Sequence, residues 1–436
     1  MTAIATAPAT APVVTTTPAD RLRARAQRVR HGVRGTPGRM RLVSAGLVVV
    51  GLLVGVAAAT SLRAADGALV RADANARQLV RLQQIQTSLV NADADATNAF
   101  LVGGLEPVAQ RRDYDAAIEQ ALAQLAFAAR AQPADGDALA ALNTAVERYT
   151  SGVQQARAAN RQGLPLGAQY LREAGAALRT TALPLLESLT SANAERVQTE
   201  FAGARRARVG LAVAGVLGLG LLLAALVWLA RLTHRYVNVP LAAAGAVVLV
   251  VLVVGVVVLT AVATRVTQVR DGPYAQARAL AQARVAAFDA KANESLTLVS
   301  RGSGAAFEKA WKTSAGTTTS ALDRAVAAGT DPNDLVSGWA AYTGLHGAIR
   351  AKDDGGGWDD AVALATTRDA GSANATFASF DTRSATALAD AGRSTTSGLD
   401  DARRGLAVGG WLGLLLGVLA AALAWWGLAQ RIEEYR

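Results

Sequence analysis

The chain has 436 residues, 51% of them hydrophobic, and a formal net charge of +10. It contains no cysteine, which excludes disulfides and thiolate metal sites. The positive charge is concentrated in short segments beside apolar stretches, so we expect a membrane protein and no nucleic-acid partner.

Four uncharged stretches are long enough to cross a bilayer as helices, which takes about 20 apolar residues. They are residues 42–62, 209–230, 239–263 and 405–428. A buried helix of a soluble protein is rarely apolar on every face over such a length. The sequence therefore predicts a multi-pass protein of the cell membrane with four transmembrane helices.

The charges beside these stretches predict the topology. Residues 1–41 contain eight arginines and one aspartate, and their Ala/Thr/Pro-rich first half is typical of a disordered tail. Residues 231–238 form a short turn that carries Arg231 and Arg235, which we also expect to contact a cytoplasmic partner. Because basic residues in short flanking segments mark the cytoplasmic side, this tail, this turn and the C-terminal tail 429–436 are predicted to be cytoplasmic.

The segment 63–208 is then extracytoplasmic, and its sequence is helical almost throughout. Apolar positions recur in steps of three and four, as in a heptad seam; they are Leu82, Ile85, Leu89, Ala92, Ala96 and Ala99. Helix breaks are expected at 103–107, 132–137 and 162–167, and a bend is expected at Pro184. Four helices joined by three short links predict an up-down four-helix bundle.

The second half of the chain repeats the first at an offset of 196 residues. Val43 corresponds to Val239, where the third apolar stretch begins, and Asp93 corresponds to Asp289. The segment 264–404 is therefore predicted to be a second extracytoplasmic bundle produced by internal duplication. In each copy the outer helices are expected to continue into the membrane without a Gly/Pro linker, so that a helix displacement could cross it.

Small residues at four-residue spacing in the apolar stretches suit close helix contact. Examples are Gly51 with Gly55, and Gly409 with Gly413 and Gly417. No ionisable residue lies in any of the four stretches, which disfavours transport.

An up-down bundle places its first and third links at the tip far from the membrane, where a partner could dock. The predicted partner-binding residues at these tips are Leu105, Glu106, Leu164, Pro165, Leu166, Arg301 and Trp358. Exposed apolar groups and Trp or Arg anchors are typical of interaction sites. The alternative is that the apolar residues cap the bundle's own core. We expect Trp311 and Trp339 to be core residues.

A polar cluster precedes the first tip. Asp93, Asp95 and Asn98 could contact an amino-acid-like ligand, but no arginine lies beside them in the sequence to bind a carboxylate. A solvated helix face is the preferred interpretation.

Catalytic and metal-binding groups do not cluster in the sequence. His31, His234 and His346 fall in a tail, a turn and a helix, and no strand precedes Gly355-Gly356-Gly357 to form a phosphate loop. We expect no enzymatic activity, no cofactor and no metal site.

The four apolar stretches, the two helical segments and the sequence IQTSLVNADADATNAFLVGGLEP at 85–107 resemble the GlnX family of actinobacterial membrane proteins. The resemblance implies amino-acid sensing together with GlnH, a solute-binding lipoprotein, and PknG, a soluble Ser/Thr kinase. The separate segments are also similar to the four-helix sensor modules of chemoreceptors, but no signalling coiled coil follows the last apolar stretch.

The leading hypothesis is therefore a transmembrane signalling adaptor that relays extracytoplasmic amino-acid availability from such a lipoprotein to such a kinase. A direct small-molecule sensor and a structural membrane scaffold are the alternatives. A homo-oligomer is left open.

Overall fold

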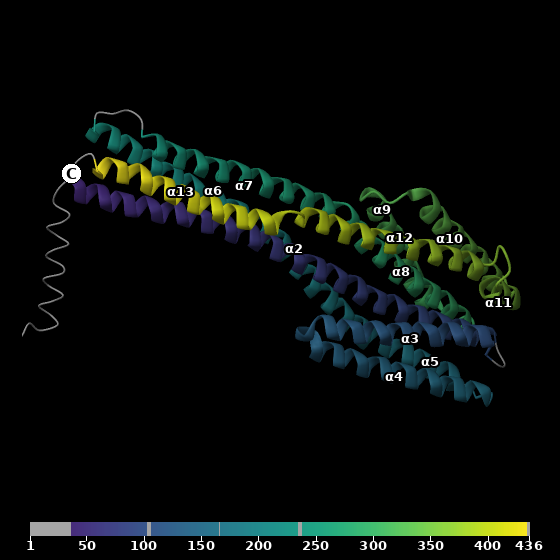
Figure 1. Cartoon of the computed structure of the whole chain (residues 1–436). Helices are drawn as coiled ribbons and strands as arrows, with labels where there is room; N and C mark the ends of the chain where they lie inside the picture. The colour runs from purple at the N-terminus through teal and green to yellow at the C-terminus, as the bar shows by residue number, and fades with distance from the viewer. Residues whose placement is uncertain (1–35, 103–105, 165, 234–237, 434–436) are drawn as a thin grey trace, which may run out of the picture. The chain divides into compact units, whose positions relative to one another are not determined.

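The computed structural model describes residues 36–102, 106–164, 166–233 and 238–433. Throughout these ranges the fold is all-α and contains no strand, which confirms the predicted class. The elements in chain order (Figure 1) are α2 (Thr36–Val102), α3 (Val108–Ala131), the 3-10 helix η1 (Pro133–Asp135), α4 (Gly136–Arg161), α5 (Leu166–Ala177), the π-helix η2 (Leu178–Ala182), α6 (Leu183–Thr233), α7 (Val239–Asp271), α8 (Pro273–Val299), α9 (Ala305–Ala327), α10 (Pro332–Asp354), α11 (Trp358–Thr366), α12 (Ala373–Arg403) and α13 (Leu406–Glu433).

Several predictions fall outside the described residues. They concern the disordered tail as far as residue 35 and the individual residues Leu105, Pro165 and Arg235.

Within the described ranges, four helical segments are long and apolar enough to cross a membrane, as predicted. Their apolar residues belong to α2, α6, α7 and α13. The chain is therefore consistent with a multi-pass membrane protein.

The described residues divide into two compact units. One, here called the apolar unit, comprises α2 as far as Leu62, Arg208–Val257 and the residues from Val408 onward. The other, here called the bundle unit, comprises Arg63–Ala207 and Val258–Ala407.

In the apolar unit, α2 and α13 approach closely at glycines. A Cβ atom added at Gly55 would lie 2.7 Å from Cα of Gly417, and one at Gly51 would lie 2.8 Å from the main-chain nitrogen of Ala421. These are the small residues whose spacing predicted helix contact, and the absence of side chains is what allows the two backbones to meet.

The first core of the bundle unit lies among α2, α3, α4, α5 and α6. All six positions of the predicted seam are buried: Leu82, Ile85, Leu89, Ala92, Ala96 and Ala99. Tyr149 of α4 and Leu171 of α5 are among the side chains that complete this core.

The second core lies among α8, α9, α10, α11 and α12, and α2 also contributes to it through Val90, Ala94 and Leu101. Trp311 and Trp339 are buried in it, as expected. Because α2 packs against both cores, this part of the helix has almost no face left for water.

The helix breaks in the first half fall within the predicted links. Just before Pro184, where a bend is predicted, the structure contains the π-helix η2. A proline ring clashes with the carbonyl four residues earlier, here Thr180, and the wider π-turn covers that position.

The expectation of uninterrupted helices into the apolar stretches is correct for the first half and wrong for the second. There, Gly272 separates α7 from α8, which starts at Pro273, and Gly405, with φ +87°, separates α12 from α13. Proline supplies no amide hydrogen and glycine tolerates the left-handed region, so these residues end the helices locally.

Candidate functional site

The polar cluster of α2 is buried rather than solvated. Asp93 is 1% exposed and Asn98 is 4% exposed, whereas Asp95 is half-buried. The prediction of a solvated helix face is therefore wrong for Asp93 and Asn98. The reason is that α2 has a core on each side at this level.

An arginine from a distant part of the chain pairs with Asp93 of this cluster. The Arg179 guanidinium contacts Oδ2 of Asp93 at 2.7 Å and Oδ1 of Asp289 at 3.1 Å. Asp289 also accepts hydrogen bonds from Ser314 (2.6 Å) and Asn293 (3.1 Å). The two aspartates belong to α2 and α8, so Arg179 connects the first and second halves of the bundle unit.

Arg179 lies within the π-helix η2. Such one-turn π segments are frequently found at functional sites because they re-aim side chains within a helix. Arg179 is not evident as a partner from the sequence, because it lies far from Asp93 along the chain. The available signals were Pro184 and the predicted correspondence of Asp93 with Asp289.

Burial dominates the electrostatics of the α2 aspartates. It raises the pKa of Asp93, although the Arg179 charge opposes this, and it raises the pKa of Asp95 to about 7, with Asp113 as the next contributor. Burial lowers the pKa of Arg179, but Asp93 and Asp289 outweigh this and leave it raised above the ordinary value. Arg179 therefore stays charged.

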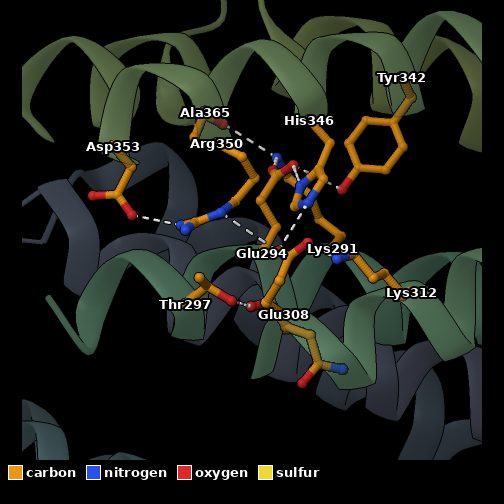
Figure 2. Close-up of polar contacts among 11 residues, drawn as sticks. Lys291, Glu294, Thr297, Glu308, Lys312, Tyr342, His346, Arg350, Asp353 and Ala365 are labelled. Carbon is orange, nitrogen blue, oxygen red and sulfur yellow. Dashed lines mark hydrogen bonds and ion pairs between the residues drawn. The ribbon is translucent and has the colours of Figure 1, made fainter. Parts of the chain in front are cut away.

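A second polar network lies in the second half and is centred on Glu294 (Figure 2). Glu294, 1% exposed, accepts hydrogen bonds from Lys291 Nζ at 2.8 Å and from the Tyr342 hydroxyl at 3.2 Å. His346 Nδ1 lies 2.9 Å from its second oxygen. Burial alone would raise the pKa of Glu294, but Lys291 and His346 hold it below its ordinary value.

His346 links Glu294 to a further carboxylate. Its Nε2 lies 3.2 Å from Oε2 of Glu308, and its ring stacks on Trp311 with centroids 3.5 Å apart. Figure 2 shows His346 between the two glutamates. Both ring nitrogens of His346 therefore lie within hydrogen-bond distance of a glutamate carboxylate.

The network reaches the surface through Arg350. This residue lies 3.6 Å from Glu308 and pairs with Asp353 and Asp354 at 2.5 Å each. The result is a continuous polar network from buried Lys291 to exposed Asp354. Among the described residues, no three His, Asp or Glu side chains are placed to hold a metal ion.

The tip residues of the first half have different environments. Leu164 and Leu166 are 44% and 47% exposed, so both are available to a partner. Glu106 is half-buried and pairs with Arg157 at 2.7 Å, and Arg157 in turn covers the ring of Tyr114. Glu106 therefore already has an ion-pair partner within the bundle unit.

Arg301 and Trp358, predicted at the second tip, contact each other. The Arg301 guanidinium lies 4.0 Å from the Trp358 ring centroid, and Trp358 Nε1 donates to the carbonyl of Leu298 at 3.0 Å. Trp358 packs against the second core, which leaves Arg301 as the exposed member of the pair. The predicted cytoplasmic contact Arg231 is exposed near the end of α6.

These features define an all-helical protein with four membrane-spanning candidates and a helical unit built around buried charge networks. Residues 64–202 match the family model described as the actinobacterial sensor domain. The match includes Asp93, Asp95, Asn98 and Arg179, and it supports a sensor protein of the actinobacterial type with a sensing or signalling role. No curated protein and no solved structure matches the chain significantly.

Proposed function

We propose that the chain is a transmembrane signalling adaptor without enzymatic activity. It receives a report of extracytoplasmic amino-acid availability from a solute-binding lipoprotein and relays it to a cytoplasmic Ser/Thr kinase, as in the GlnX family that the segment 85–107 resembles. The observation that carries this proposal is the sensor-domain match over residues 64–202, in a chain with four membrane-spanning candidates.

The proposed orientation places both termini in the cytoplasm and the bundle unit outside. It is supported by the arginines of residues 1–41 and of the turn 231–238. In this orientation Arg231 and Arg235 face the kinase. No cofactor takes part.

We further propose that the bundle unit consists of two tandem four-helix bundles derived by duplication. Asp93 and Asp289, which correspond at the offset of 196 residues, contact the same arginine. Ala92 and Ala96 of the first seam are buried. Ala292, which lies 196 residues after Ala96 and is its counterpart in the second half, is buried as well. A lipoprotein that displaces one bundle would therefore act on the other through Arg179.

The tip of the first half is the proposed lipoprotein contact, because Leu164 and Leu166 are exposed apolar side chains close together. We expect Leu164→Glu with Leu166→Glu to reduce lipoprotein capture at least tenfold, since two charges would face an apolar contact. The measurement is a pull-down of the tagged full-length protein from native envelopes with and without L-glutamate, read by mass spectrometry.

The matched control is Leu122→Glu, which places the same charge at a 41% exposed leucine of α3 away from these links. Circular dichroism and unfolding temperature establish that each variant is folded. Equal capture by the tip variant and the wild type would refute the tip contact, and absence of any captured lipoprotein would refute the adaptor role.

A further inference from the structure

The bundle unit contains a cavity of about 790 Å³ between α2, α3, α8 and α12. Ligand pockets for small molecules typically measure about 300–1,000 Å³. The cavity contains none of the residues of the Arg179 contact or of the Glu294 network described above. It therefore needs its own explanation.

Positive charge predominates along the cavity wall. Its charged lining residues are Arg77, Arg81, Arg278, Arg284, Arg393, Asp381 and Asp400. Five guanidinium groups thus face two carboxylates, an excess that favours an anion.

Three of these arginines already have carboxylate partners. Arg77 pairs with Asp73 at 2.9 Å and Arg284 with Asp381 at 2.7 Å. Arg393 pairs with Asp390.

The other two arginines form no ion pair within the described part of the chain. Arg81, which is half-buried, contacts only the side-chain oxygen of Gln78, at 3.4 Å. Arg278 lies at the exposed edge of the cavity, and its charge acts on the Tyr274 hydroxyl of the same wall. A guanidinium presents a planar fork of donors that matches a carboxylate. Arg81 and Arg278 are therefore free to bind one.

Two neutral polar groups of the cavity wall are also unsatisfied. The Gln83 Oε1 atom and the Tyr274 hydroxyl are buried and have no hydrogen-bond partner among the described residues. Both residues line the cavity, and they are 7% and 3% exposed, respectively. Buried polar groups normally have partners, so these two point to a ligand that offers donors and acceptors.

The remaining wall is apolar and includes Leu79, Val80 and Leu388. Gly392 lies in the same wall, and a Cβ atom added there would meet nothing within 4 Å. The cavity is thus open beside Gly392 and can accept a hydrocarbon chain.

We propose that this cavity binds a small organic carboxylate directly. Arg81 and Arg278 hold its carboxylate groups, Gln83 and Tyr274 bond its other polar atoms, and the apolar wall packs against its carbon chain. This site is independent of the lipoprotein contact, so either can fail while the other holds.

The test is isothermal titration calorimetry on the full-length protein in lipid nanodiscs. Sodium succinate, sodium L-glutamate and sodium citrate are titrated at constant ionic strength, with neutral succinamide as the uncharged counterpart of succinate. We expect at least one of the three anions to bind saturably with one site per chain, and succinamide to bind at least tenfold more weakly than succinate if succinate is the ligand.

Two kinds of variant locate the site. Arg81→Gln removes one free guanidinium, and Gly392→Phe fills the open space; each should weaken binding at least tenfold. Arg172→Gln, at an exposed arginine of α5, and Gly344→Phe, at a helical glycine of α10 whose added Cβ also meets nothing within 4 Å, are the matched controls and should bind as the wild type does.

Binding of none of the three anions would overturn the proposal. So would binding that persists at wild-type strength in both folded cavity variants. Unfolding temperatures of all variants are measured in parallel. Arg81→Gln removes a charge, whereas Gly392→Phe fills space. If one of these variants fails to fold, binding by the other still tests the proposal.

Discussion

Charged side chains leave water at a high cost, and a buried charge is stable only with a partner. Arg179 has two such partners, Asp93 and Asp289, and Glu294 is held by Lys291 and His346. Removing one member of such a group typically lowers the free energy of unfolding by about 3–5 kcal/mol, because the remaining buried charge is left without a partner. These residues therefore fix how the helices of the bundle unit meet.

Asp95 gives the bundle unit a defined pH dependence. Burial raises its pKa to about 7, from an ordinary value of 3.8, so the folded state binds a proton more tightly than the unfolded state. Stability contributed by this group is therefore lost as the pH rises from about 4 to 7, and the loss levels off above 7. We expect Asp95→Asn to stabilise the protein at pH 8 by roughly 1–2 kcal/mol, after allowance for the side chain's partial contact with solvent.

The measurement is the unfolding temperature of wild type and variant between pH 5 and pH 8. The difference between the two proteins should grow with pH. Asp323→Asn, at an exposed aspartate of α9, is the control and should leave the wild-type profile unchanged. A gain that is the same at pH 5 and pH 8 would contradict the assignment to Asp95.

At the scale of elements, the contact of α2 with α13 depends on glycine. A side chain at Gly55 would meet the Gly417 main chain at 2.7 Å, and the backbone of a packed helix cannot move aside without separating the pair. We expect Gly55→Leu to destabilise the apolar unit by about 1–3 kcal/mol through overpacking. The loss is read from thermal unfolding of the purified protein in detergent.

Gly220→Leu makes the same change at an exposed glycine of α6, where an added Cβ would meet nothing within 4 Å. It should leave the unfolding temperature nearly unchanged. Equal effects of the two substitutions would argue against close α2–α13 packing.

Local sequence patterns predicted much of the fold because they report local physics. The three-and-four spacing from Leu82 to Ala99 identified a buried helix face, and Gly163, with φ +69°, lies in a predicted link. The two breaks at Gly272 and Gly405 are not predicted, because the apolar stretches beside them indicate continuous helices more strongly than single Gly or Pro residues indicate a break. Pro184 predicts a bend but does not specify the π-turn that precedes it.

The candidate site was less predictable because its contacts join distant parts of the chain. Asp93 and Asp95 were identified as polar positions, yet their burial depends on a second core formed nearly 200 residues later. His346 has no other histidine near it in the sequence, and its partners in the structure are glutamates from α8 and α9. Helical periodicity does not contain that information.

Across the whole bundle unit, ion pairs connect the first and second halves at several levels. Arg179 contacts Asp289 at 3.1 Å, Arg403 contacts Asp66 at 3.1 Å, and Arg368 pairs with Asp113. Links of this kind make the two halves respond together when one is displaced. In the proposed adaptor, such a concerted displacement is the signal that reaches the cytoplasmic kinase.

The most direct test of the proposed signalling role is to measure kinase-dependent phosphorylation in cells after L-glutamate is added. A strain that lacks the protein is compared with the wild type and with the deletion strain complemented by the full-length chain. The account predicts that the deletion abolishes the phosphorylation response and that complementation restores it. A response of wild-type size in the deletion strain would contradict a signalling role and favour a structural scaffold.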